Sequence, residues 1–82
     1  MYEDLASAPS RVIGVKQTVR ALERGAVLAV YVARDAEERV VRELKALAMA
    51  KGVPVTLVES MDELGKVCGI DVGAAAAAIL HE

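Results

Sequence analysis

The sequence contains no tryptophan or phenylalanine, and its two tyrosines are its only aromatic residues. Modules that stack bases on aromatic rings, such as RRM and OB domains, are therefore disfavoured. Tyr31 falls inside an apolar run and is expected in the core, which must otherwise be built from valine, leucine, isoleucine and alanine. The single cysteine, Cys68, cannot form an internal disulfide, and this fits a reducing cytosol.

Catalytic residues are scarce, since the one histidine, His81, is next to the last residue, where a disordered, solvated side chain is the usual outcome. No base can be assigned to Cys68, which we expect to be a small buried hydrophobic residue. Two acidic pairs are typical of first helical turns: Glu37 with Glu38, and Asp62 with Glu63. A phosphate-binding loop and a dinucleotide glycine fingerprint are both missing, and we expect no enzymatic activity, no metal site and no cofactor.

The remaining bulk properties set the class of protein. A length of 82 residues favours one domain, and 55% hydrophobic residues allow a core but leave little room for a deep cleft. The net charge of −2 excludes a uniformly basic nucleic-acid binder, so any such site must be a local patch. We expect no signal peptide, because no early apolar run follows a basic start, and the longest near-apolar stretch, residues 72–80, is too short to span a bilayer. We expect a cytoplasmic protein without a membrane partner.

The spacing of apolar residues predicts alternating helices and strands. We expect helices over residues 2–8, 15–24 and 36–51 and in a short segment after Ser60, and strands over residues 11–13, 28–33, 55–58 and 74–80. The run from Leu28 to Ala33 is apolar on both faces, which is typical of a central strand. This order of elements predicts an α/β fold, a three-layer α/β/α sandwich around a mixed four-stranded sheet.

Residues 74–80 are the ambiguous segment. Alanine is the best helix former, so propensity alone favours a helix. A lone helix of about seven residues is marginal, however, and the alternating order of elements requires a strand here. We therefore predict a strand whose small side chains allow packed helices to approach closely.

Turn and capping residues mark the expected helix ends. Two pairs have the spacing of capping boxes that would begin the third and fourth helices: Asp35 with Glu38, and Ser60 with Glu63. Glycines are placed to end the second and third helices: Gly25, and Gly52 after Lys51. The expected buried positions follow the helical period: Val15, Val19 and Leu22, then Val40, Leu44, Leu47 and Ala48, then Met61, Leu64 and Val67.

The stretch GVKQTVR, residues 14–20, is the first candidate site. On a helix that begins there, one face carries a line of polar side chains: Lys16, Gln17, Arg20 and Arg24. Residues 11–24 hold four cations and one anion, a local charge of +3 in an acidic chain. Gly14 lets a ligand approach the backbone, and a helix start adds unpaired N–H groups. Lysine and glutamine can bind base edges and arginine can bind phosphates, yet an ordinary solvated helix face has the same pattern.

The stretch LGKVCGIDVGAA, residues 64–75, is the second candidate site. Its three glycines, four residues apart, permit tight turns around Ile70, Asp71 and Val72. Two exposed aliphatic side chains in a rigid loop could pack against an unstacked base. The alternative is that Ile70 and Val72 only anchor the loop to the core.

These two stretches, in this order and at this separation, resemble the kink-turn RNA-binding ribosomal-protein family, the L-seven-Ae and L-thirty-e family. The likeness is strongest to its small bacterial members, the L-seven-Ae-like ribosome-associated proteins, and it covers residues 5–80. It implies an α/β/α sandwich that binds a kinked RNA duplex with tandem sheared G·A pairs. We expect a monomer whose partner is a structured RNA with a kink-turn, ribosomal or other.

Two sets of residues match the RNA contacts of this family. The first faces the G·A pairs from the start of the second helix: Gly14, Lys16, Gln17 and Arg20. The second is a loop whose aliphatic side chains pack on a flipped-out nucleotide: Ile70, Asp71, Val72 and Gly73. Asp35 matches an acidic position just after the central strand, near the RNA surface. Arg24 extends the cationic helix face and suits a phosphate contact.

Lys16 and Gln17 depart from archaeal and eukaryotic members, which usually have Asn and Glu at these positions, and agree with the bacterial subgroup. A second class of function is a protein-interaction scaffold of the same fold that does not contact RNA. One feature separates the two classes. If the chain's own acids paired with Lys16, Gln17 and Arg20, an RNA function would be disfavoured.

Overall fold

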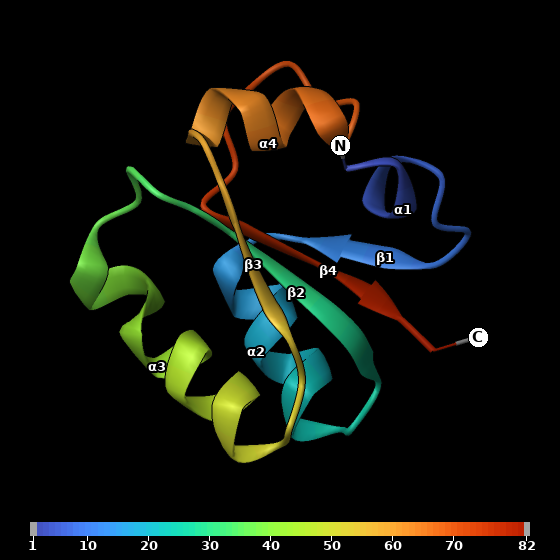
Figure 1. The fold of residues 1–82 in the computed structure, drawn as a ribbon, viewed down its shortest axis with the longest axis vertical. Helices are drawn as coiled ribbons and strands as arrows, with labels where there is room; N and C mark the ends of the chain where they lie inside the picture. Colours follow the sequence, from blue (N-terminus) through green and yellow to red (C-terminus); the bar gives the residue numbers. More distant parts are fainter. Residues whose placement is uncertain (1, 82) are drawn as a thin grey trace.

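The computed structural model describes residues 2–81, which form alternating helices and strands (Figure 1). The helices are α1 (Glu3–Ala6), α2 (Val15–Glu23), α3 (Glu38–Ala50) and α4 (Met61–Val67). The strands are β1 (Arg11–Ile13), β2 (Val27–Ala33), β3 (Val55–Val58) and β4 (Ala76–Leu80). Their order in the sheet is β1-β4-β2-β3, with β2 and β3 parallel and the other neighbours antiparallel. The predicted α/β fold with a mixed four-stranded sheet is confirmed.

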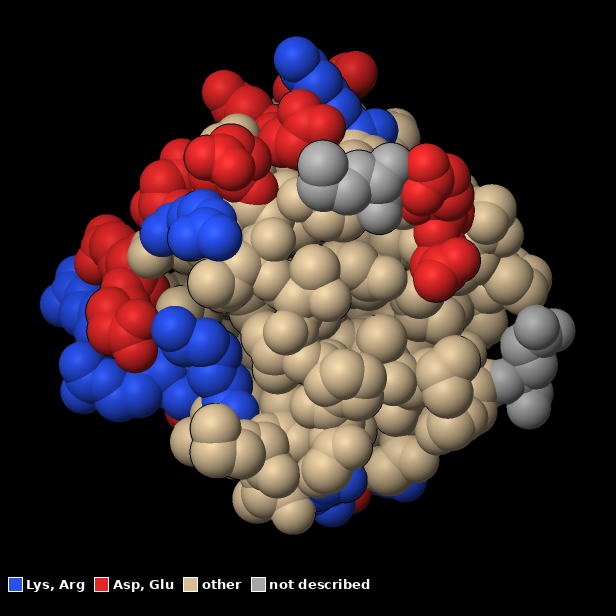
Figure 2. All heavy atoms as spheres, in the orientation of Figure 1, with Lys and Arg blue, Asp and Glu red and all other residues tan. Residues whose placement is uncertain are grey.

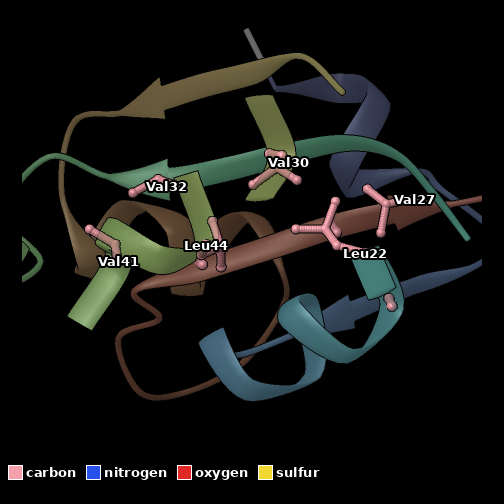
Figure 3. Packing of buried hydrophobic residues seen from close by; sticks show 10 residues of the cluster. Leu22, Val27, Val30, Val32, Val41 and Leu44 are labelled. Carbon is pink, nitrogen blue, oxygen red and sulfur yellow. The ribbon is translucent and has the colours of Figure 1, made fainter. Parts of the chain in front are cut away.

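Hydrophobic cores lie on both faces of the sheet. On one face, α2 and α3 pack against β2 and β4 through buried side chains (Figure 3): Leu22, Val30, Val32, Val41, Leu44 and Ala78. On the other face, α1 and α4 pack against β2, β3 and β4: Leu5, Tyr31, Val58, Leu64 and Ala77. β2 is therefore a central strand buried on both faces, as predicted. Leu28 is 53% exposed because the pairing register of β2 shifts between Val27 and Ala29.

β4 is built from alanine because elements pack closely on both of its faces. Ala76, Ala77 and Ala78 have no exposed surface. β4 pairs with β1 on one side and with β2 on the other, so its backbone groups have partners within the sheet. Pairing and burial outweigh the helix propensity of alanine. The predicted strand is confirmed, although it begins at Ala76 and not at Ala74.

The predicted start of α3 is wrong. α3 begins at Glu38, and its N-cap residue, Glu37, makes no side-chain capping hydrogen bond. Asp35 lies in a turn before the helix, and its carboxylate accepts a hydrogen bond from the backbone N–H of Met61 at 2.8 Å. The capping box of Asp35 and Glu38 does not form because Asp35 caps α4 instead. The other predicted cap is present, since Ser60 Oγ accepts from the N–H of Glu63 at 3.0 Å.

The buried stripes of the two long helices differ from the predicted ones. In α3, Val41 faces the core with Leu44 and Ala48, whereas Val40 is 44% exposed. Val40 and Val41 are adjacent and chemically alike, so the period alone does not choose between them. In α2, the fully buried residues are Thr18, Ala21 and Leu22, and the predicted Val15 and Val19 pack at the margin of the core.

Arg11 joins α1 to α4 and takes no part in the basic face of α2. Its guanidinium donates to the carbonyls of Leu5 at 2.9 Å, Ala6 at 3.2 Å and Cys68 at 2.8 Å. These carbonyls stand where the two helices end, and the carbonyl of Leu5 also accepts from the N–H of Ala8 at 3.4 Å. Cys68 is 2% exposed, as predicted, and burial raises the pKa of its thiol while the nearby Arg11 charge lowers it to a smaller extent. The face of α2 therefore keeps three cations, Lys16, Arg20 and Arg24, against one anion.

Candidate nucleic-acid interface

Both candidate segments lie at one end of the strands, where β2 and β3 end and β4 begins (upper left in Figure 1). Three backbone hydrogen bonds join the elements there: Gly14 N–H to the Ala76 carbonyl (2.8 Å), Ala33 N–H to the Ala75 carbonyl (2.9 Å) and Arg34 N–H to the Val58 carbonyl (2.8 Å). The start of α2, the end of β2 and the loop before β4 therefore form one continuous surface. We call this the edge surface; it comprises residues 14–20, 34–35 and 70–75.

Gly14 begins α2 in a backbone conformation that other residues avoid. Its φ is 112° and its ψ is 150°. A Cβ at this position would also lie only 2.7 Å from Oε1 of Gln17, whose side chain folds back over the helix start. Among the residues that the structure describes, no side chain caps α2, and its first turn contains no acid. The first N–H groups and the partial positive charge of the helix are therefore left for a ligand.

Lys16, Gln17 and Arg20 are exposed. The ion pairs found within residues 2–81 lie on or just before α3: Glu37 with Arg39, and Glu38 with Arg42 and Lys45. None of them involves Lys16 or Arg20. These two cations instead border a shallow hollow between α2 and α3, which Glu23 and Glu43 also line. Within residues 2–81, no acid is thus paired with Lys16 or Arg20, which is the outcome that favours an RNA ligand over the scaffold alternative.

Charged side chains are unevenly spread over the rest of the surface. In the view of Figure 2 they gather over α3, α4 and α1, and the middle of that face has none. Phosphate groups would find no cationic partner in the middle of that face.

The loop of residues 70–73 holds one anchored and one free aliphatic side chain. Ile70 is half-buried and packs against the core formed with α1 and α4, as the anchoring alternative expects. Val72 is 70% exposed, so anchoring does not describe Val72. Asp71 and Gly73 are also exposed. The edge surface therefore presents a single protruding aliphatic side chain.

Gly65 allows this loop to lie directly against α4. It is a buried residue of the helix, and a Cβ there would collide with the carbonyl oxygen of Val72. A Cβ at Gly73 would lie 3.2 Å from the Cβ of Met61, so the loop and the helix are also in close contact at the start of α4. Gly65 thus serves close packing and not the tight turn that the glycine spacing suggested. Gly69, with a φ of 75°, is the glycine that turns the chain.

Two further arginines differ in their position relative to the edge surface. Arg24 is the C-cap residue of α2, about 12 Å along the helix axis from Lys16, so the fold does not bring it to the edge surface. Arg34 is exposed directly after β2 and lies on the edge surface, although the sequence patterns did not single it out. Its place beside Asp35, just after the predicted central strand, is the signal that could have identified it.

Comparison with known proteins gives the family. A model of the ribosomal protein L7Ae/L30e/S12e/Gadd45 family matches residues 3–82. The chain belongs to this family. An RNA-binding protein of Halalkalibacterium halodurans is 53% identical over 78 residues, which are 95% of each chain. Large ribosomal subunit protein eL8 of Halobacterium salinarum is 46% identical over 68 residues, which are 82% of this chain and 57% of that protein.

A solved structure of the same fold extends the comparison. The Giardia lamblia 15.5kD RNA binding protein superposes with a TM-score of 0.86 at 27% identity, covering 98% of this chain and 68% of the other. The family expected from the two stretches is thus confirmed, and so is the likeness to small bacterial members. Within the described part of this family member, no helix is long and apolar enough to cross a membrane, and no cluster of three His, Cys, Asp or Glu side chains could hold a metal ion.

Proposed function

We propose that this chain binds structured RNA at the edge surface, and that its preferred target is a kink-turn with tandem sheared G·A pairs. The observation that carries the proposal is that one edge surface holds both the uncapped, basic start of α2, bonded to Ala76 of β4, and the exposed side chain of Val72 in the loop before β4. The RNA-binding relative of almost equal length supports RNA as the ligand. The ribosomal relative supports a ribonucleoprotein as the setting, with ribosomal RNA as one possible target.

The two parts of the edge surface have different tasks in this proposal. Lys16 donates to guanine O6 and N7, and Gln17 donates and accepts at a base edge. Arg20, one turn further along, pairs with phosphate, and Arg24 does the same where an RNA strand follows α2. Val72 packs on a nucleotide displaced from the stack, flanked by Asp71 and Gly73. In this proposal α2 binds the base edges and the phosphate backbone of the RNA, and the loop binds the displaced nucleotide.

Lys16→Ala tests the base-edge contact. We expect this variant to bind a kink-turn RNA more weakly by about 1–3 kcal/mol, the usual worth of a good base-edge contact. Lys51→Ala is the matched control, because Lys51 is an exposed lysine at the end of α3, near the opposite end of the strands. Gel-shift titrations of both variants at one salt concentration give the comparison. Equal losses in the two variants would mean general attraction to phosphate and would contradict a specific role for Lys16.

A further inference from the structure

The carboxylate of Asp35 is engaged within the protein, although it lies on the edge surface. Its Oδ1 accepts a hydrogen bond from the backbone N–H of Met61 at 2.8 Å. Met61 is the first residue of α4, so this bond satisfies an N–H group that a helix start leaves unpaired. The negative charge also lies near the positive end of the helix. Because Ser60 caps the same turn through Glu63, side chains from two separate segments hold the start of α4.

Met61 connects the start of α4 to the loop that carries Val72. Its carbonyl accepts a hydrogen bond from the N–H of Ala74 at 3.0 Å, and its Cβ would lie 3.2 Å from a Cβ at Gly73. Further along α4, Gly65 lies directly against the carbonyl oxygen of Val72. The loop is therefore packed against α4 at two points. A displacement of the start of α4 would move the loop with it.

We propose that Asp35 is a positioning residue for the RNA contact of Val72 and does not contact RNA itself; this inference rests on the proposed function. By holding Met61, Asp35 fixes the start of α4 to the turn after β2, and so keeps the loop that carries Val72 in its place on the edge surface. A free carboxylate at this surface would repel phosphate. Bound to the N–H of Met61, the acceptor oxygen of Asp35 instead holds the arrangement that presents Val72.

A pair of variants separates the hydrogen bond from the charge. Asparagine keeps an acceptor oxygen at the same place and loses the charge, whereas alanine loses both. We expect Asp35→Ala to weaken kink-turn binding about tenfold and Asp35→Asn to stay within about twofold of the wild type, the scale of one lost hydrogen bond against none. In the free protein, the amide of Ala74 should exchange faster in Asp35→Ala and not in Asp35→Asn. A similar loss of affinity in both variants would assign Asp35 a direct contact and overturn the positioning role.

A double-mutant cycle with Val72 separates positioning from general destabilisation. In a Val72→Ala background, Asp35→Ala should lower affinity by less than about twofold, since the contact that it positions is already lost. Losses that multiply would show two independent effects and overturn the positioning role alone. If the wild-type chain does not bind the kink-turn RNA at all, the proposed function itself is overturned. The wild-type titration therefore distinguishes failure of the function from failure of this inference.

Discussion

Gly65→Ala should destabilise the protein by about 1–3 kcal/mol, the range for forcing extra atoms into a well-packed site. A local view of the helix predicts the opposite, since alanine in a helix is better than glycine by about 1 kcal/mol. The collision with the carbonyl oxygen of Val72 makes the change in stability unfavourable, because this oxygen belongs to the backbone and cannot rotate away. The loop must move, so RNA affinity should fall together with stability. Urea unfolding followed by circular dichroism, with a parallel RNA titration, measures both.

Gly69→Ala is the control for this substitution. A Cβ at Gly69 has no neighbour within 4 Å, but its φ of 75° favours glycine. Its cost should come from backbone strain alone, about 1–2 kcal/mol. Amide chemical shifts of residues 72–74 should move in Gly65→Ala and much less in Gly69→Ala. A more stable Gly65→Ala protein with an undisturbed loop would mean that α4 and the loop are not in the close contact described above.

Val72→Asp should abolish measurable binding to the kink-turn and leave the fold almost unchanged. The side chain is 70% exposed, and exposed substitutions usually change stability by no more than about 0.5 kcal/mol. The aspartate would replace an apolar contact with a charge that faces a nucleotide and its phosphates. Thermal unfolding and a gel-shift titration on the same preparation measure the two quantities separately.

Leu28→Asp is the matched control for Val72→Asp. Leu28 is 53% exposed near the start of β2, at the end of the strand away from the edge surface. The same chemical change there should leave RNA affinity within about twofold of the wild type, as expected for a residue outside the contact. A large fall in the melting temperature of Val72→Asp would instead assign Val72 to anchoring the loop. Unchanged affinity in a stable Val72→Asp protein would remove the displaced nucleotide from the proposal.

The order and type of the elements could be predicted because several independent signals agreed for each. β4 is the exception, because its signals disagreed: five consecutive alanines from residue 74 favour a helix by propensity. The alternating order of elements correctly predicted a strand, because the sheet needs a member between β1 and β2. The glycine ends of α2 and α3 were also predictable, since Gly25 and Gly52 both have the positive φ that ends a helix.

The errors arose where a local signal had a partner far away in the sequence. Asp35 has the spacing of a capping box with Glu38, but from the turn after β2 it caps the start of α4. Arg11 counted as part of a basic cluster, but it binds carbonyls at the ends of α1 and α4. Neither partner is visible from spacing, because it depends on how strands and helices are arranged in three dimensions.

The candidate site was predictable as a pair of segments but not in its internal detail. The sequence patterns could not separate Ile70, which packs on the core, from Val72, which protrudes. The difference follows from the close packing at Gly65, which requires the helix and the loop to be placed together. Arg34 was missed for a related reason, since only the fold brings the turn after β2 to the start of α2.

The most direct test of the account is the affinity of the wild-type chain for two matched RNAs. One carries a kink-turn with tandem sheared G·A pairs, and in the other these pairs are replaced by Watson–Crick pairs, with calorimetric or gel-shift titrations at one salt concentration. We predict a preference for the kink-turn of at least about tenfold, the scale of one or more lost base-edge contacts. Equal affinities with the same dependence on salt would contradict specific recognition and leave only attraction to the phosphate backbone.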